Sequence, residues 1–187
     1  PNGAGISTLL DGNPQNNFIR RARLKDGSDA FNPKGILKGA RFIKFVGIYA
    51  YIVCDAGIAV VNLDDPLAPK LVTVIGEPFL RGVRALDVQF RYAFVVDQDG
   101  LKVLDITFPD RPQPIRSALV PIADARRIYV ARTYAYIAAG RQGLVIVDVE
   151  RPDKPCLDQV FNANGQINDA HDVQLGMVNN SLFAFLA

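Results

Sequence analysis

The chain has 187 residues, of which 49% are hydrophobic and 21% are charged, a composition typical of folded globular domains. Its formal net charge is only +2, so no strong electrostatic field is implied, whereas phosphate binding depends on a concentrated basic surface. The local basic cluster Arg20, Arg21, Arg23 and Lys25 is interpreted as part of a solvated edge strand. The longest apolar run, Ile48–Cys54, ends at Asp55 and is much shorter than the roughly 20 residues of a transmembrane helix. We therefore expect no nucleic-acid partner and no membrane insertion.

The first predicted element is a strand over Phe18–Leu24, within an N-terminal region that extends to Lys38. This region, residues 1–38, lies outside the internal repeat that fills the remainder of the chain. We interpret it as a loop together with the outer strand of a repeat unit that precedes the first complete one.

Three similar segments follow, Tyr49–Pro69, Tyr92–Pro112 and Tyr134–Pro155. Several columns of this alignment recur every 43 residues: the glycines 57, 100 and 143, the prolines 66, 109 and 152, and a second set of prolines at 69, 112 and 155. Because independent columns keep one spacing, the sequence predicts a tandem array of one supersecondary unit.

Each unit is predicted to contain four short strands, which in the second copy are Ala85–Phe90, Tyr92–Asp97, Leu101–Thr107 and Ile115–Val120. A turn with glycine separates the second strand from the third, and a Pro-x-x-Pro turn ends the third strand. The segment Arg126–Gly140 has helix-favouring residues, but equivalent segments of the other copies have the composition of strands. We therefore predict strands there as well.

The third strand of each unit is apolar on both faces, as in Leu144–Val147, so both faces of its sheet must be covered. Radially packed blades of a β-propeller meet this requirement, and a four-stranded antiparallel unit of about 43 residues is typical of such blades. The predicted fold class is therefore all-β, with propeller blades of four antiparallel strands. The expected blades are residues 39–80, 81–122 and 123–166, and a partial blade spans 167–187.

The third copy contains Gly143–Asp148, the sequence GLVIVD, which resembles the LVIVD repeat family. A diverged form of the same string occupies Leu101–Asp105, and Ile58–Asn62 has departed further from it. The resemblance implies a β-propeller of the kind found in exported or cell-surface proteins of bacteria and archaea, often as part of a larger polypeptide. It implies no shared catalytic residues.

Three complete blades flanked by two partial ones leave two interpretations open. The partial pieces pair and close a four-bladed ring, or the chain is part of a longer propeller. We favour the second, because the predicted strand at Phe183–Leu186 would otherwise leave an apolar edge unpaired.

The candidate anion or partner site is a column of residues that precede the first strand of successive blades. Its members are Arg41, Arg84 and Arg126, with Asp169 in the fourth copy and His171 close by. If the first strand is innermost, these side chains surround the mouth of the central channel and attract an anion or an acidic loop. The alternative, which we favour, is structural pairing of each arginine with carboxylates such as Asp55, Asp87 or Asp97 between blades.

Other motifs give weaker signals. The turn Asp97–Gly100 resembles the start of a calcium loop, but too few acidic residues follow to supply six to eight oxygen ligands, so a plain hairpin turn is favoured. One histidine and two distant cysteines, Cys54 and Cys156, make neither a metal set nor a disulfide framework. We expect no cofactor, no metal and no catalytic residues.

The favoured function is a non-catalytic binding or scaffolding module outside the cytoplasm, in the periplasm or at the cell surface. Its partner would be another protein or the remainder of the same polypeptide that completes the propeller. One alternative is a ligand-binding or enzymatic propeller with an anion site at the channel mouth. Another is an accessory domain of an electron-transfer assembly whose cofactors lie elsewhere.

Overall fold

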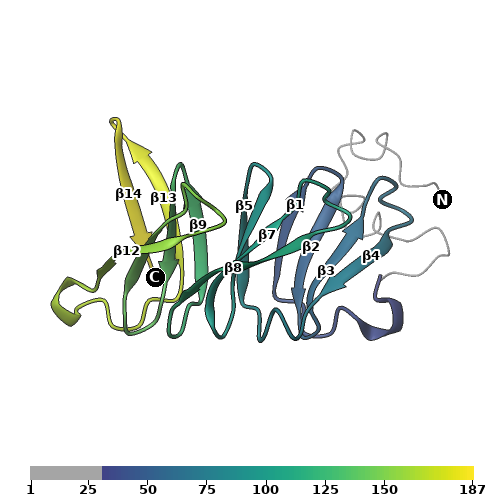
Figure 1. Cartoon of the computed structure of the whole chain (residues 1–187), viewed down its shortest axis with the longest axis horizontal. Coiled ribbons are helices and arrows are strands. Elements are labelled where there is room, and N and C mark those ends of the chain that lie inside the picture. The colour runs from purple at the N-terminus through teal and green to yellow at the C-terminus, as the bar shows by residue number, and fades with distance from the viewer. Residues whose placement is uncertain (1–30) are drawn as a thin grey trace, which may run out of the picture.

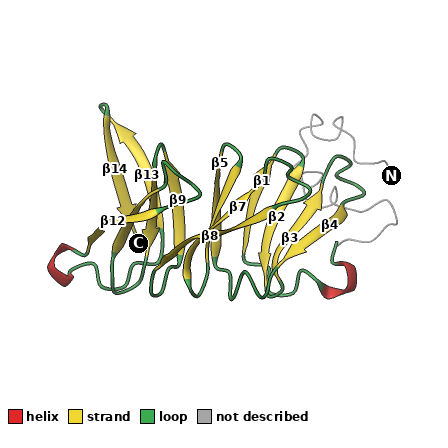
Figure 2. Cartoon of the chain, viewed as in Figure 1, coloured by secondary structure: helices red, strands yellow, loops and turns green. Residues whose placement is uncertain are grey.

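A computed structural model of the protein describes residues 31–187 and shows an all-β chain, interrupted by short 3₁₀ turns such as Pro33–Gly35 and Ala163–Gly165 (Figure 2). The predicted strand Phe18–Leu24 lies outside the described residues. Among residues 31–187, no helix has the length and apolar character needed to cross a membrane.

The strands form three four-stranded antiparallel sheets and one two-stranded sheet, each built from consecutive strands (Figure 1). Blade 1 contains β1 (Phe42–Val46), β2 (Tyr49–Cys54), β3 (Gly57–Asn62) and β4 (Lys70–Ile75). Blade 2 contains β5 (Ala85–Gln89), β6 (Tyr92–Val96), β7 (Gly100–Asp105) and β8 (Gln113–Pro121). Blade 3 contains β9 (Arg127–Ala131), β10 (Tyr134–Ala138), β11 (Leu144–Asp148) and β12 (Cys156–Phe161), and the partial blade 4 contains β13 (Val173–Val178) and β14 (Ser181–Leu186).

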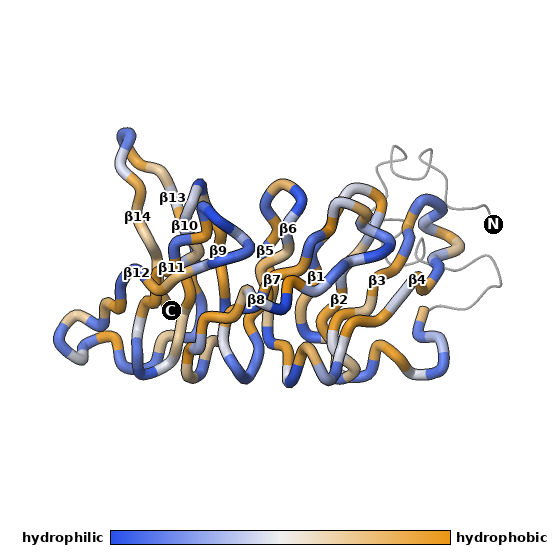
Figure 3. The backbone as a smooth tube through the Cα atoms, in the orientation of Figure 1, coloured by the Kyte–Doolittle hydropathy of each residue, from blue (hydrophilic) through white to orange (hydrophobic). Residues whose placement is uncertain are grey.

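These sheets are propeller blades, as the sequence predicts. The first strands of successive blades, β1, β5, β9 and β13, lie next to one another, so strand one is the inner strand. The segment Arg126–Gly140, which has helix-favouring residues, contains β9 and β10, and this confirms the strand prediction. Apolar residues concentrate in the strands and polar residues in the turns between them (Figure 3).

Glycine determines the turn between the second and third strands. Gly100 has a φ of +133°, and a Cβ atom built on it would lie 2.2 Å from the Val120 carbonyl oxygen. Gly57 is equally crowded, with the Ile75 carbonyl oxygen 2.2 Å from the same position. No other residue type combines this φ with so close an approach of the fourth strand, which explains the glycine column of the repeat.

The core consists of separate apolar layers between neighbouring blades. Large layers lie between blades 1 and 2 and between blades 2 and 3, and they contain fully buried side chains such as Tyr51, Leu104 and Ile137. The layer between blades 3 and 4 has only four buried residues: Ala138, Leu144, Ala170 and Val173. Blade 4 is therefore held much less extensively than the complete blades.

One hydrogen bond spans the first large layer. The Tyr51 hydroxyl of blade 1 donates a 2.6 Å hydrogen bond to the carbonyl oxygen of Pro109, which lies in the outer turn of blade 2. Burial, together with the nearby charge of Asp110, raises the pKa of Tyr51 well above its usual value. The hydroxyl is thus a neutral donor that joins a repeat proline to the neighbouring blade.

Candidate functional site

The three column arginines occupy one backbone position in successive blades. The backbone N–H groups of Arg41, Arg84 and Arg126 donate to the carbonyl groups of Val53, Val96 and Ala138, at distances of 3.0, 2.9 and 2.8 Å. Each accepting residue lies in the second strand of the same blade, so each arginine extends the pairing of the inner strand. The regular sheet therefore places the guanidinium groups at corresponding points of adjacent blades.

The arginine side chains reach across to the next blade. Arg41 donates through Nε and Nη2 to the Val83 carbonyl oxygen, at 3.1 and 3.0 Å. Arg84 donates through Nη1 to the Ala125 carbonyl oxygen at 3.1 Å. In both cases the acceptor directly precedes the next arginine of the column, so the column is a chain of contacts between blades.

Each arginine also has a carboxylate partner. Arg41 pairs with Asp55 at 2.9 Å and Arg84 pairs with Asp124 at 2.6 Å. Arg126 contacts Asp124 as well, at 2.6 Å, and Asp169 at 2.8 Å. Hydrogen bonds from Arg126 and, to a smaller extent, from Arg84 lower the pKa of Asp124 below its ordinary value. The pairs Arg41–Asp55 and Arg126–Asp124 lie within one blade, whereas Arg84–Asp124 and Arg126–Asp169 join neighbouring blades. Of these carboxylates, only Asp55 is one that the sequence suggested.

The structure brings Asp169 and His171 to Arg126. The Arg126 Nη1 atom lies 2.8 Å from Asp169 Oδ1 and within 2.9 Å of both ring nitrogens of His171. His171 Nε2 is 3.2 Å from Asp169 Oδ2, and the His171 side chain is 64% exposed. Hydrogen bonds from Arg126 and then from His171 lower the pKa of Asp169. All five predicted site residues therefore lie in one region, near the starts of the inner strands of adjacent blades.

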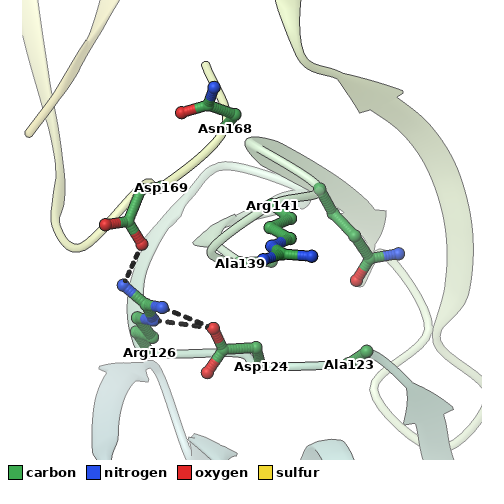
Figure 4. A pocket seen from close by; sticks show the side chains of 8 residues that line it. Ala123, Asp124, Arg126, Ala139, Arg141, Asn168 and Asp169 are labelled. Carbon is green, nitrogen blue, oxygen red and sulfur yellow. Dashed lines mark hydrogen bonds and ion pairs between the residues drawn. The ribbon is translucent and has the colours of Figure 1, made fainter. Parts of the chain in front are cut away.

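Two hollows flank this region. A smaller one, of about 360 Å³, is lined by the column arginines together with the neighbours that follow: Arg41, Arg84, Arg126, Arg127, His171 and Asp172. A larger one, of about 770 Å³, lies between the loop before β9, the β10–β11 hairpin and the segment before β13. It is lined by the residues drawn in Figure 4: Ala123, Asp124, Arg126, Ala139, Arg141, Gln142, Asn168 and Asp169.

Sequence reasoning missed four polar residues of this region, Asp124, Arg141, Gln142 and Asn168. Asp124 has a positive φ of 55° and lies two residues before Arg126, where blades 1 and 2 have Gly39 and Gly82. Arg141 and Gln142 lie in the β10–β11 hairpin, between Ala138 and Leu144. A blade-by-blade comparison of this hairpin was the signal that could have identified them.

The acidic turn of blade 2 holds a lysine. The Lys102 ammonium group lies 2.8 Å from Asp97 Oδ2, 2.6 Å from Asp99 Oδ2 and 2.7 Å from the Phe79 carbonyl oxygen. These three acceptors satisfy its three N–H donors. Lys102 is buried although its column has Ala59 and Val145 in the other blades. Among the described residues, no group of three or more His, Cys, Asp or Glu side chains is arranged to hold a metal ion.

Comparison with known sequences bears on the repeat itself. Residues 82–115 and 122–162 match the LVIVD repeat, and these segments contain most of blade 2 and all of blade 3. Blades 2 and 3 carry LVIVD repeats. Each LVIVD repeat therefore corresponds to one four-stranded blade, and an arginine of the column lies near the start of each matched segment. No curated protein matches the chain in sequence.

Solved structures with a similar fold share little sequence with these LVIVD blades. The computationally designed Ika4 protein is 14% identical and superimposes with a TM-score of 0.53, over 80% of this chain and 91% of that protein. The N-terminal domain of Nup159 is 12% identical, with a TM-score of 0.49, and the match covers 79% of this chain but only 39% of that domain. At these identities the likeness concerns the fold alone.

Proposed function

We propose that the chain is a non-catalytic binding and scaffolding module of an exported or cell-surface protein, and that a further β-strand, from a protein partner or from the remainder of the same polypeptide, pairs with β14. The observation that carries the proposal is the exposure of β14. The second strands of the complete blades, β2, β6 and β10, are mostly buried, whereas five of the six residues of β14 are exposed.

The exposed residues of this region are strongly apolar. Phe183 and Phe185 in β14 are 47% and 59% exposed, and Met177 in the neighbouring β13 is 63% exposed. In blade 3, every residue of the outer strand β12 is exposed, including Leu157 and Phe161. In the complete blades the third and fourth strands lie beyond the second strand. Strands in the equivalent positions beside β14 would cover the exposed residues of blade 4 and those of β12.

A paired strand would also provide hydrogen-bond partners for the backbone N–H and C=O groups on the free edge of β14. Its only ladder partner among residues 31–187 is β13, so within this part of the chain the polar groups on its other edge point away from the sheet. Such edges bind extended segments by antiparallel pairing, with backbone hydrogen bonds for affinity and side-chain contacts for specificity. The expected ligand is therefore an apolar segment in extended conformation.

The alternative functions receive less support from the geometry. The arginines of the candidate anion site already have carboxylate partners, which reduces the positive charge available to an external anion. An anion site at the channel mouth and an accessory role in electron transfer stay predictions.

Site-specific photo-crosslinking tests the proposal. A photoreactive residue replaces Phe185 in the native protein, and in a control it replaces Phe90, which is 91% exposed but lies in a turn. We expect position 185, and not position 90, to crosslink to the strand that pairs with β14, and we expect the β14 amides to be protected from hydrogen exchange when that strand is present. The crosslinked peptide identifies the strand as part of a partner or of the same polypeptide. No crosslink at position 185, or a crosslinked segment that leaves the β14 amides unprotected, would contradict strand pairing at β14.

A further inference from the structure

The larger hollow beside Arg126 exists in blade 3 because a contact present in the other complete blades is missing there. In blade 1 the Asp55 N–H donates to the Lys38 carbonyl oxygen at 3.0 Å, and in blade 2 the Gln98 N–H donates to the Arg81 carbonyl oxygen at 3.0 Å. Each bond closes the hairpin onto the loop before the inner strand. In blade 3 the equivalent hairpin N–H, that of Gly140, donates instead to the Ala170 carbonyl oxygen of blade 4 at 3.0 Å, and a hollow of about 770 Å³ opens between the hairpin and the loop before β9.

Blade 2 shows how the equivalent space is filled when it is closed. Arg81 pairs there with Asp99, whose carboxylate also accepts from Lys102, and Asp97 accepts from the Arg81 backbone N–H at 2.9 Å. The equivalent positions of blade 3 hold smaller or uncharged residues: Ala123, Ala139, Gln142 and Val145. The ion network of blade 2 is thus replaced in blade 3 by open space.

The hairpin of blade 3 is held in this open position by blade 4. Gly140 and Ala170 exchange two backbone hydrogen bonds of 3.0 Å, the one bridge that joins these two blades among the described residues. Gly140 has a φ of +49°, and a Cβ atom on it would lie 2.2 Å from Asp124 Oδ2. Only glycine fits here, so the backbone itself forms one wall of the hollow.

The charges that line the hollow are unequally satisfied. Asp124 is paired with Arg84 and Arg126, and Asp169 is paired with Arg126 and lies beside His171. Arg141 has no hydrogen bond or ion pair with any residue of the described part of the chain. Figure 4 shows Arg141 inside the hollow and outside the network of dashed contacts that joins Arg126 to Asp124 and Asp169. The uncompensated charge is therefore a single positive one.

Gln142 adds a polar requirement. Its Oε1 atom is buried and receives no hydrogen bond, which is costly because the atom has lost its contact with water. A ligand that satisfies the hollow must bring an N–H donor to this oxygen and negative charge to Arg141. A peptide carboxylate with a neighbouring backbone amide brings both, and a guanidinium–carboxylate pair has two parallel N–H···O bonds.

We propose that this hollow is a binding site for a peptide carboxylate, with Arg141 as its cation and Gln142 Oε1 as the acceptor for an adjacent peptide N–H. The carboxylate comes from an acidic side chain or from a chain terminus. The proposal goes beyond strand pairing at β14 and is independent of it, because the two sites share no residue.

A titration of the full chain with short peptides, followed by NMR, tests the site. One peptide has a single glutamate between glycines and both ends blocked, a second has glutamine in its place, and a third has no acidic side chain but a free C-terminal carboxylate. We expect the signals of the Gln142 side-chain amide and the Arg141 guanidinium to shift with the first peptide, the third or both, with Kd values of about 1 mM. Which of the two peptides binds identifies the source of the carboxylate.

Variants separate the pocket from general charge attraction. Arg141→Ala should weaken binding about tenfold, which corresponds to about 1.4 kcal/mol. Arg116→Ala is the control, because Arg116 is also exposed and also has no partner in the described structure, but lies on β8. Thermal unfolding should be unchanged in both variants. Equal binding of the glutamine peptide, equal losses in the two variants, or no shift with any peptide would overturn the proposal and leave strand pairing at β14 unaffected.

Discussion

Lys102 and Asp97 form a buried ion pair in blade 2, with 2.8 Å between Nζ and Oδ2 and with side chains 7% and 0% exposed. Asp97 also accepts the backbone N–H of Asp99 at 2.8 Å and that of Arg81 at 2.9 Å. The pair thus ties the hairpin, the inner loop and the third strand of one blade together. A buried pair of this kind is sensitive to the loss of one partner, because the other charge then lacks compensation.

We predict that Lys102→Val lowers the free energy of unfolding by about 3–5 kcal/mol, because the Asp97 and Asp99 carboxylates lose the ammonium group between them. The triple variant Asp97→Ala, Asp99→Gln, Lys102→Val installs the residues of blade 3. It should be more stable than the single variant, because no charge is left buried alone. Chemical denaturation measures both, and a triple variant no more stable than the single one would contradict this account.

The repeat predicted the fold because its strongest columns record backbone geometry. The glycines follow from a positive φ and the close approach of the fourth strand, and the prolines lie in the turn between the third and fourth strands in every copy. The inner position of strand one places the column arginines, Asp169 and His171 in one region.

The details of the site could not be predicted, because they break the repeat. Lys102 stands in a column that is otherwise apolar, and Asp124 stands where blades 1 and 2 have Gly39 and Gly82. Which carboxylate meets which arginine depends on side chains that cross from one blade to the next. A period of 43 residues describes one blade and contains no information about these crossings.

The Tyr51 hydroxyl provides a second test of the contacts between blades. Tyr51→Phe should lower the free energy of unfolding by about 1–2 kcal/mol, because the Pro109 carbonyl oxygen loses its 2.6 Å hydrogen bond within the core. Tyr49→Phe is the matched control, because Tyr49 lies on the same strand and its hydroxyl makes no hydrogen bond within the described structure. Equal losses in the two variants would show that the bond to Pro109 contributes nothing specific.

Acid should weaken the arginine column. The pKa of Asp124 is lowered in the folded protein, mainly by Arg126, so the stabilisation it provides is present above its unfolded pKa of about 3.9 and is lost as the pH falls through the lower folded value. Asp124→Asn should therefore be less stable than the wild type at pH 7, and the difference should shrink below about pH 4.

The control for this pH dependence is Asp64→Asn, since Asp64 is exposed and makes no ion pair among the described residues. Its unfolding profile should follow that of the wild type throughout. If the difference between Asp124→Asn and the wild type stayed constant from pH 7 to about pH 3, the ionised pair would not be its source.

The crowded glycine of blade 2 gives the last prediction. Gly100→Ala should lower the free energy of unfolding by about 3 kcal/mol or more, because its φ of +133° is strained for any other residue and its new Cβ would meet the Val120 carbonyl oxygen at 2.2 Å. Gly47→Ala also introduces a methyl group at positive φ, +58°, but nothing lies within 4 Å of it. The second variant should lose only about 1 kcal/mol, since it has the strain of a left-handed conformation without the collision. Thermal and chemical unfolding of the pair measure the difference, which equals the contribution of the close contact between the hairpin and the fourth strand. Similar losses in both variants would mean that backbone conformation alone accounts for the glycine column.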